Sequence, residues 1–587
     1  MTNTSVSPGP IINPKGKLPV GVSDFIKLVQ GDYCFVDKSL FIKELLDSGD
    51  DVTLITRPRR FGKTINMHML CEFLRQGVQK QNDLFAGLAI HEQCMQYQQE
   101  RGKRPVVFIT FRGVKESNWS NAYARTQILL SQLTEEVSRD APVTKLGHSQ
   151  QEIVHKVIHR QAHPVECESI LAILTQLLTL KHNGITPWVL IDEYDAPMQA
   201  AYQHDYYKDM RDLMKGLLGD CLKDNPFLHR AVLTGILRIA KEDIFSELNN
   251  PGVFGVLDDR FASHFGFSEF EVRQLLTHKG LTDRFEMVQQ TYDGYRFGQD
   301  TPATVYNPWS VIRYVSQPTK EAPLYWVNTS DNYLIHKLLS RADTTVKQGL
   351  YELLDTKSGH TTIQSLQEQV PLRFIEHNSK NLWGLLLASG YLTAESINRV
   401  PGSSAQEVRL CIPNEEVQGV YGDLLHRWAQ GGNGSGGNGM QLLDALVGGS
   451  IDLFAEEFPK LVATSVGYYD TGGDNPERFY HAFVLGLMQY LRDRYHIRSE
   501  RESGTGRYDL ALEPKNNTLR GFVMEFKKGL RADGTLQQAA EKALKQIQDK
   551  SYHTDLLQRG IKQVIAIGLA FRGKQVAVAY TNLSVNS

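Results

Sequence analysis

Two groups of residues in this sequence have the types and spacing needed for phosphate chemistry. The first ends the stretch TRPRRFGKT and consists of Gly62, Lys63 and Thr64. The second lies in GFVMEFKK, where Glu525 and Lys527 are two residues apart and so share one face of an extended strand. Lysine, hydroxyl and carboxylate groups are the side chains that hold phosphates and magnesium ions. The sequence therefore predicts two separate sites for phosphate oxygens.

The N-terminal group has the strand-loop-helix context of a phosphate-binding loop. An apolar stretch at 51–55 precedes it, and a helical pattern at 63–74 follows it. Gly62 lets the backbone approach a phosphate, and the helix N-terminus offers unpaired N–H groups. We expect Lys63 to reach the terminal phosphates and Thr64 to bind Mg²⁺. The alternative is an ordinary helix N-terminus that happens to read FGKT.

One glycine of the usual loop pattern is missing, because Arg57 stands where the first glycine is expected. That glycine mainly eases a turn at the end of the strand, and the fixed φ angle of Pro58 is expected to shape the turn instead. Arg59 and Arg60 add positive charge beside the predicted anion, so we expect both to contact the nucleotide.

Two further apolar stretches end in residues suited to nucleotide hydrolysis. WVLIDE ends in Asp192, which is placed to hold Mg²⁺ through water, and Glu193, which is placed to polarise the attacking water. RAVLTG contains Thr234 near its end, where a hydroxyl can sense the terminal phosphate, and Arg238 follows within a turn. Solvated strand-end acids, a helix cap and a surface arginine are the corresponding structural alternatives.

Near the C-terminus, Asp509 in RYDLAL is separated from GFVMEFKK by a turn around PKNN. If these strands pair in antiparallel orientation, Asp509 lies beside Glu525, and two neighbouring carboxylates form a hard-oxygen Mg²⁺ site. Such an ion can generate hydroxide and offset charge on the phosphate, while Lys527 orients water or neutralises the developing charge. The alternative is an exposed ion pair between Glu525 and Lys527 on an edge strand, which would contribute little to stability.

The elements that must position these residues form α/β domains joined by a helical region. Nearly continuous apolar stretches at 51–55, 105–111, 188–193 and 230–235 are typical of strands covered on both faces. The pattern then turns mainly helical, and GGNGSGGNG is a flexible linker. We expect a disordered N-terminal tail at 1–17, an α/β domain at 18–268, a mainly helical domain at 269–430, a Gly-rich linker at 431–439 and a second α/β domain at 440–587.

The charge of the chain is unevenly distributed. The net charge is −2, but residues 476–587 contain 18 Lys and Arg against 11 Asp and Glu, a net charge of +7. The remaining residues contain 46 basic and 55 acidic side chains, a net charge of −9. A basic module on an acidic body favours a polyanionic partner for the C-terminal part, although a chance surface bias explains the numbers equally well.

Several classes of protein are disfavoured by composition. The six cysteines are scattered without a CxxC pair, so neither a disulfide framework nor a zinc site is expected. No apolar run approaches the roughly 18 residues of a membrane span, and the polar N-terminus lacks the apolar core of a signal peptide. We therefore expect a cytoplasmic protein without a membrane partner.

The motifs LPVGVSDFIKL, YCFVDKSLFI, TRPRRFGKT, LIDEYDAP and TGILRIAKEDIFSELNN, with YDGYRFG and VYNPWSV further on, resemble those of bacterial AAA-ATPase-like proteins. The similarity extends from Leu18 over nearly the whole chain, and an arginine at position 57 is usual in that family. The resemblance implies a P-loop NTPase domain with a parallel sheet and flanking helices, a helical middle region and a C-terminal PD-(D/E)XK restriction-endonuclease-like α/β domain.

The order of an acid on a first helix, an Asp, a Glu-x-Lys strand and a Gln on a later helix resembles PD-(D/E)XK nucleases. Tyr508 stands before the Asp where proline gives the motif its name, which is common in this superfamily. We expect His481, one turn beyond the helix acid, to be a packed helix histidine. The resemblance implies that Glu477 is the helix acid, Asp509 and Glu525 are metal ligands, Lys527 is the catalytic lysine and Gln546 is the later polar contributor.

The leading hypothesis is an ATPase coupled to a metal-dependent nuclease that cleaves nucleic acid, most readily DNA. Its cofactors are ATP and Mg²⁺, with Mn²⁺ as an alternative ion at the nuclease site, and Glu193 activates water for ATP hydrolysis. ATPases of this kind often complete their site with a neighbour's arginine, so a homo-oligomer is one expected state. The alternatives are a nucleotide-gated switch with a non-cleaving nuclease-like domain, and a nuclease that binds ATP only as a structural ligand.

Overall fold

The structure of the chain is a computed structural model in which most residues are described. The predicted linker lies outside the described residues up to residue 436, and so do the first nine residues of the predicted tail. The described residues are 10–76, 83–239, 251–326, 333–340, 342, 346, 349–350, 352–353, 359–366, 369–370, 379–399, 406–421, 437–465, 476–491, 494–499, 502–503, 506–529 and 534–584.

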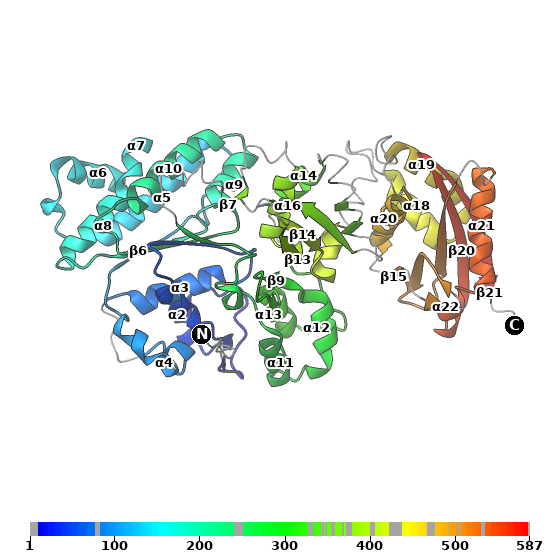
Figure 1. Cartoon of the computed structure of the whole chain (residues 1–587), viewed down its shortest axis with the longest axis horizontal. Helices are drawn as coiled ribbons and strands as arrows, with labels where there is room; N and C mark the ends of the chain where they lie inside the picture. The colour runs from blue at the N-terminus through cyan, green and yellow to red at the C-terminus, as the bar shows by residue number, and fades with distance from the viewer. Residues whose placement is uncertain are drawn as a thin grey trace. The chain divides into compact units, whose positions relative to one another are not determined.

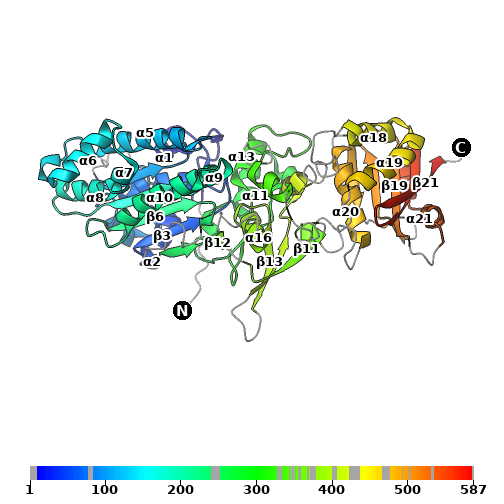
Figure 2. The ribbon, with the colours of Figure 1, turned by 90° about the horizontal axis from the view of Figure 1, so that it is seen from above.

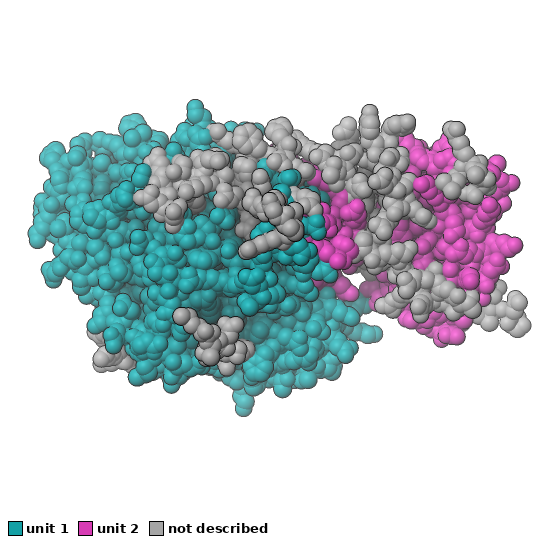
Figure 3. All heavy atoms as spheres, in the orientation of Figure 1, with its two compact units in different colours: residues 1–328, 364–408 teal, residues 329–363, 409–587 magenta. Residues whose placement is uncertain are grey.

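The chain forms two compact units, which are coloured separately in Figure 3. The first comprises Met1–Asn328 and Gln364–Val408, and the second comprises Thr329–Ile363 and Arg409–Ser587. Each unit contains one of the two groups of residues that the sequence singles out. The domain boundaries expected from the sequence remain predictions.

The first unit contains a five-stranded parallel sheet with the order β4-β5-β6-β3-β8, and its strand β6 is labelled in Figure 1. Every residue of β3 and β5 is buried, as expected for strands covered on both faces. All four predicted strands belong to this sheet, which confirms the predicted α/β class. The strands are β3 (Val52–Thr56), β4 (Val106–Thr110), β5 (Trp188–Asp192), β6 (Arg230–Gly235) and β8 (Gly252–Phe254).

Helices flank this sheet. The helix α3 (Lys63–Leu74) follows the loop after β3 and contacts β4, β5 and β6. A second group of helices packs together beside the sheet, in cyan and green in Figures 1 and 2. These helices are α5 (Trp119–Ser138), α6 (His148–Ile158), α7 (Pro164–Glu168), α8 (Ile170–Lys181), α9 (Ala196–Gln203) and α10 (Tyr207–Leu222).

Two residues within the predicted N-terminal tail lie in a short strand. The strand β1 (Ile11–Ile12) pairs in antiparallel orientation with β2 (Phe35–Val36). Ile11 also packs against the hydrophobic cluster that contains Val272 and Tyr314. The strand was not predicted because the segment around it is polar and rich in proline and glycine. Its two isoleucines favour an extended strand and gain apolar contacts there.

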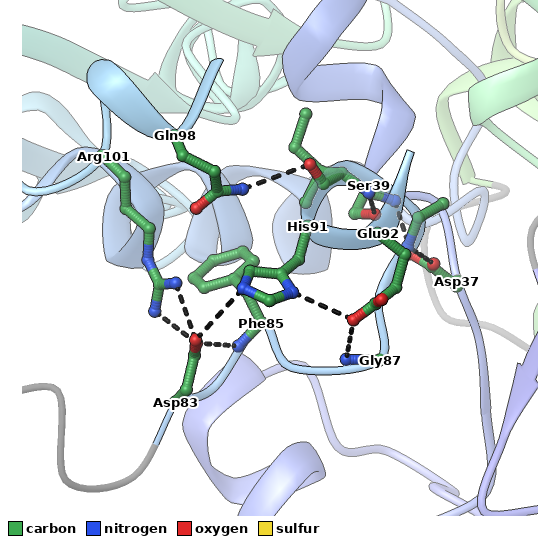
Figure 4. A network of polar contacts seen from close by, with 11 residues as sticks. Asp37, Ser39, Asp83, Phe85, Gly87, His91, Glu92, Gln98 and Arg101 are labelled. Carbon is green, nitrogen blue, oxygen red and sulfur yellow. Dashed lines mark hydrogen bonds and ion pairs between the residues drawn. The ribbon is translucent and has the colours of Figure 1, made fainter. Parts of the chain in front are cut away.

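Side chains near the N-terminus also hold a short helix in place (Figure 4). Asp37 and Ser39 accept hydrogen bonds from the backbone N–H groups of α4 (Ala89–Glu92), at 2.7 and 3.0 Å. Beside this helix, Asp83 pairs with Arg101. These contacts satisfy N–H donors that a helix N-terminus otherwise leaves without partners.

The segment after β8 is mainly helical, in agreement with the sequence. A cluster of buried apolar side chains from α11, α12 and α13, including Val272, Val288 and Val311, forms its core. The described elements are α11 (Glu269–His278), α12 (Phe285–Tyr292), β9 (Tyr295–Phe297), β10 (Ala303–Val305), α13 (Pro308–Ser316), α14 (Tyr333–Ser340), β11 (His360–Gln364), β12 (Gln369–Val370), α16 (Ser379–Ala388), β13 (Thr393–Arg399) and β14 (Gln406–Cys411).

The second unit contains a mixed sheet with the order β15-β18-β19-β20-β21, in which only β19 and β20 pair in parallel orientation. The long helix predicted around 536–550 is α21 (Leu536–Asp549), and it packs on β19, β20 and β21. Its approach is close, because a Cβ at Gly568 would lie 2.2 Å from the carbonyl oxygen of Ala540. The strands are β15 (Tyr495–Ser499), β18 (Leu510–Pro514), β19 (Gly521–Lys528), β20 (Gln563–Arg572) and β21 (Gln575–Ser584).

The second unit also contains the helices α18 (Gly437–Gly448), α19 (Ile451–Ser465), α20 (Pro476–Met488) and α22 (Thr554–Gln558). Within the described part of the chain, no helix has the length and apolar character needed to cross a membrane.

Candidate functional site

The sheet of the first unit gathers the N-terminal candidates at one edge. β6 lies between β3 and β5, and all three strands run in the same direction. Their carboxyl ends therefore meet, and the carboxyl edge of an open parallel sheet is where α/β proteins bind ligands. Lys63 and Thr64 follow β3, Asp192 ends β5, and Thr234 lies in β6.

Asp192 is the centre of this group and is fully buried. Its Oδ2 accepts hydrogen bonds from the hydroxyls of Thr64 at 3.0 Å and Thr110 at 3.3 Å, and its Oδ1 accepts one from Thr234 at 2.8 Å. The structure thus brings together three residues that the sequence predicted. Thr110 was missed, although it is the next-to-last residue of a predicted strand, as Thr234 is.

Lys63 lies with its ammonium against the loop that precedes it. The Nζ donates to the carbonyl oxygens of Arg57 at 2.9 Å and Pro58 at 2.8 Å. Burial lowers the pKa of Lys63 to about 8, although the acids Glu193, Asp195 and Asp192 raise it. A buried cation at the start of a helix suits an anionic ligand.

Glu193 follows β5 with a φ of 52°, in the left-handed region. The side chain is half-buried, and burial raises its pKa while Lys63 opposes that shift. A carboxyl group with a raised pKa is suited to accept a proton from water. Because Glu193 directly follows β5, it lies at the same sheet edge as Asp192, and it interacts electrostatically with Lys63.

Arg57 has a different role from the glycine it replaces. Its guanidinium is fully buried and donates to the carbonyl oxygens of Thr56, Phe254, Gly255 and Arg260. The positive φ angles of the loop occur instead at Arg60 and Gly62, at 70° and 86°. No glycine is therefore required at position 57, and the arginine fastens the loop to the chain after β8.

The three other predicted arginines lie in distinct surroundings. Arg59 is half-buried and donates to Oε1 of Gln199 at 3.1 Å. Arg60 is exposed, and its guanidinium lies over the ring of Trp309 at 4.4 Å. Arg238 is half-buried in the short strand β7 (Arg238–Ile239), which pairs with β12.

The C-terminal candidates meet in the second unit, where β18 and β19 pair in antiparallel orientation with Leu510 opposite Met524. Asp509 directly precedes β18, and its Oδ2 accepts the backbone N–H of Phe526 at 2.7 Å. Asp509 and Glu525 are therefore neighbours, as expected if the two strands pair in antiparallel orientation.

Glu525 is buried, with 3% of its surface exposed. Its Oε1 accepts hydrogen bonds from Lys527 at 3.1 Å and from Gln546. Its Oε2 is buried without a hydrogen-bond donor among the described residues. Burial, and then the nearby Asp509, raise the pKa of Glu525 to about 7, and Lys527 offsets only part of this. The predicted alternative of an exposed ion pair on an edge strand is wrong, because β19 lies between β18 and β20.

Three further side chains or positions complete this description. Gln546 of α21 also donates to the hydroxyl of Tyr552 at 3.2 Å, a residue that the sequence did not single out. His481 of α20 is buried, with Nε2 3.0 Å from the carbonyl oxygen of Asp509, and is a packed helix histidine as expected. Glu477 lies in α20, but its side chain is not among those described.

Comparison with known proteins assigns both regions. A family model described as predicted AAA-ATPase matches residues 19–245, and one for the PD-(D/E)XK nuclease superfamily matches residues 475–581. An uncharacterized protein of the vnfD 5′ region of Azotobacter chroococcum mcd 1 is 25% identical over 569 residues, covering 94% of this chain and 96% of that protein. The chain is thus similar to AAA-ATPase-like proteins over residues 19–245 and to the PD-(D/E)XK nuclease superfamily over residues 475–581, and these two matches confirm the architecture that the sequence motifs predicted.

Proposed function

We propose that the protein hydrolyses ATP in its first unit and cleaves DNA phosphodiesters with a divalent metal in its second unit. One observation carries the nuclease assignment. Asp509, Glu525, Lys527 and Gln546 come from a loop, a strand and a helix and converge around one carboxylate. These are four of the five residues that the nuclease motif implies, the fifth being Glu477, and they lie within the segment that matches the superfamily model.

The donor set fits Mg²⁺ or Mn²⁺. Two carboxylates supply hard oxygens, and Oε2 of Glu525 is buried without a hydrogen-bond donor among the described residues. A buried charged oxygen is costly unless a cation or a donor compensates it. Asp509 and Glu525 would hold the ion, which when bound would supply Lewis-acid activation of water and phosphate.

The other residues of the site would position the reactants. Lys527 is 35% exposed at its side chain, so its ammonium can face a phosphate while it remains near Glu525. It would neutralise charge as water adds to phosphorus and the bond to the leaving oxygen breaks. Gln546 would hold the Glu525 carboxylate in one orientation.

In the first unit, Lys63 would bind the terminal phosphates, while Thr64 and Asp192 would hold Mg²⁺. Glu193 would accept the proton of the attacking water. The hydroxyl of Thr234, which donates a hydrogen bond to Asp192, would respond to the terminal phosphate. Arg59, Arg60 and Arg238 would add positive charge around the phosphates. The hydrogen bonds that join Thr64, Thr234 and Asp192 support a single ATP site at this edge of the sheet.

DNA is the proposed substrate because residues 476–587 have a net charge of +7. Positive charge at this level favours association with the phosphate backbone. The test compares Lys527→Ala with Lys528→Ala on supercoiled DNA in Mg²⁺ or Mn²⁺, with and without ATP. Lys528 is a matched control, since it is the next residue of β19 and is exposed.

We expect Lys527→Ala to reduce cutting by about 100-fold or more, and Lys528→Ala to cut nearly as well as the wild type. Equal cutting by Lys527→Ala and wild type would contradict the nuclease assignment. Phosphate release by a wild-type protein that cuts no DNA with either metal would favour the nucleotide-gated switch.

A further inference from the structure

Behind the phosphate loop, the buried carboxylate of Asp195 joins two parts of the first unit. Asp195, at the start of α9, is 1% exposed, and its Oδ2 accepts the backbone N–H groups of Ile236 at 3.0 Å and Leu237 at 2.8 Å. The same oxygen accepts a hydrogen bond from Nε2 of Gln199 at 2.7 Å. The turn after β6 and the helix after β5 are therefore held by one oxygen atom.

Gln199 extends this connection to the phosphate loop. While its Nε2 donates to Asp195, its Oε1 accepts from the guanidinium of Arg59 at 3.1 Å. Both ends of the amide are thus used, which fixes the orientation of the side chain. The loop is also tied to the same turn directly, because the N–H of Arg57 donates to the carbonyl oxygen of Gly235 at 3.1 Å.

The packing at this junction allows little freedom. A Cβ at Gly235 would lie 2.6 Å from Oδ1 of Asp195 and 2.7 Å from the ring of Tyr194, so only glycine fits there without a shift. Tyr194 is buried as well, and its hydroxyl donates to the carbonyl oxygen of Leu237 at 2.7 Å. Rigid packing of this kind holds hydrogen-bonded groups in one geometry.

Arg59 also lies close to the phosphate-binding lysine. The positive charge of Arg59 lowers the pKa of Lys63, although this effect is smaller than those of burial and of the nearby acids. Two cations held near each other repel, and a phosphate between them would relieve that repulsion. A planar guanidinium also matches the geometry of phosphate oxygens.

We propose that Gln199, fixed by Asp195, is a positioning residue that directs Arg59 onto the terminal phosphate of ATP. This inference rests on the proposed ATP hydrolysis and deepens it. Arg59 then supplies, within the same chain, the arginine that many ATPases take from a neighbouring subunit. The link to Ile236 and Leu237 connects that arginine to the turn beyond Thr234.

The test measures kcat, KM and the dissociation constants of ATP and ADP for Gln199→Ala, Arg59→Ala and the double variant. Gln203→Ala is the matched control, because Gln203 lies one turn later in the same helix. We expect Gln199→Ala to lower kcat by about 10- to 100-fold with a small change in KM, since misplacing a reacting group has effects of this size. Arg59→Ala should lose the preference for ATP over ADP.

The double variant distinguishes positioning from general damage. If Gln199 acts through Arg59, the double variant is no slower than Arg59→Ala, whereas independent effects would multiply. Multiplying effects, or a Gln199→Ala variant that matches Gln203→Ala, would overturn the proposal. Should Gln199→Ala fail to fold, retained ATP preference in Arg59→Ala overturns it instead. A wild type that binds no ATP would reject the proposed function itself.

Discussion

The two candidate sites differ in how their polar groups are compensated. In the first unit, both oxygens of Asp192 accept hydroxyl hydrogen bonds, and the ammonium of Lys63 is bonded to two carbonyl oxygens. In the second unit, Oε2 of Glu525 is buried without a donor among the described residues, and Asp509 adds a second negative charge nearby. The first arrangement is internally satisfied, and the second favours a cation.

Under the proposed function, this difference would correspond to two ways of preparing a site for phosphate. A nucleotide site can exchange internal hydrogen bonds for bonds to the ligand, at a modest net cost per bond. A pair of neighbouring carboxylates instead has an unfavourable repulsion between two negative charges, which a bound cation or proton removes. The two sites also differ in construction. The first lies at the ends of several parallel strands, and the second lies on two paired antiparallel strands.

The largest expected effect tests whether the two sites are chemically separate. Lys63→Ala should lower ATP hydrolysis by about 100- to 1,000-fold, as expected for the loss of one main charge-stabilising group. Glu525→Ala should abolish DNA cutting and leave ATP hydrolysis within about twofold of wild type, because its contacts lie wholly within the second unit. Phosphate release and plasmid nicking are measured on both variants. Loss of both activities in Glu525→Ala would show that the sites are not independent.

A second experiment concerns the arginine that replaces a loop glycine. Arg57→Gly restores the common loop pattern but removes a buried guanidinium that is bonded to the carbonyl oxygens of Gly255 and Arg260. We expect a loss of about 3 kcal/mol of stability and slower ATP hydrolysis, because buried carbonyl groups lose charged donors. Chemical denaturation measures the stability. An Arg57→Gly protein as stable as wild type would show that the glycine is interchangeable with this arginine.

The smallest expected effect compares the two carboxylates directly in metal-free buffer near pH 8. Asp192→Asn should lower stability by about 1–3 kcal/mol, because an amide nitrogen would face hydroxyl donors. Glu525→Gln should raise stability by about 1 kcal/mol, because it removes a buried charge beside Asp509. Thermal unfolding in a chelator measures both changes. Shifts of the same sign would remove the distinction between a compensated and an uncompensated site.

Much of the candidate chemistry could be predicted because it depends on local geometry. Alternation along a strand requires Glu525 and Lys527 to share a face in any extended conformation. A strand followed by Gly62, Lys63 and Thr64 places the lysine in the first turn of a helix. Apolar runs that end in acids likewise predicted β5 and its terminal Asp192, because buried parallel strands have this composition.

Other features depend on residues far apart in the chain and could not be read from a local pattern. Thr110 reaches Asp192 only because β4 and β5 are neighbours, and strand order is not encoded in any single strand. Gln199 and Tyr552 are ordinary polar residues in sequence, and only their contacts in the folded chain distinguish them. The strand β1 was likewise not predicted, because its two isoleucines lie in a polar segment and pair with β2, which is distant in the sequence.

The sequence by itself determined the chemical groups and the faces on which they lie, since these follow from covalent geometry and the periods of helix and strand. The tertiary structure alone decided which groups meet and which are compensated. It turned Arg57 inward to bind backbone carbonyl groups, and it left one oxygen of Glu525 buried without a donor among the described residues. Burial and pairing are properties of the packed chain, and they set the electrostatic energy of each site.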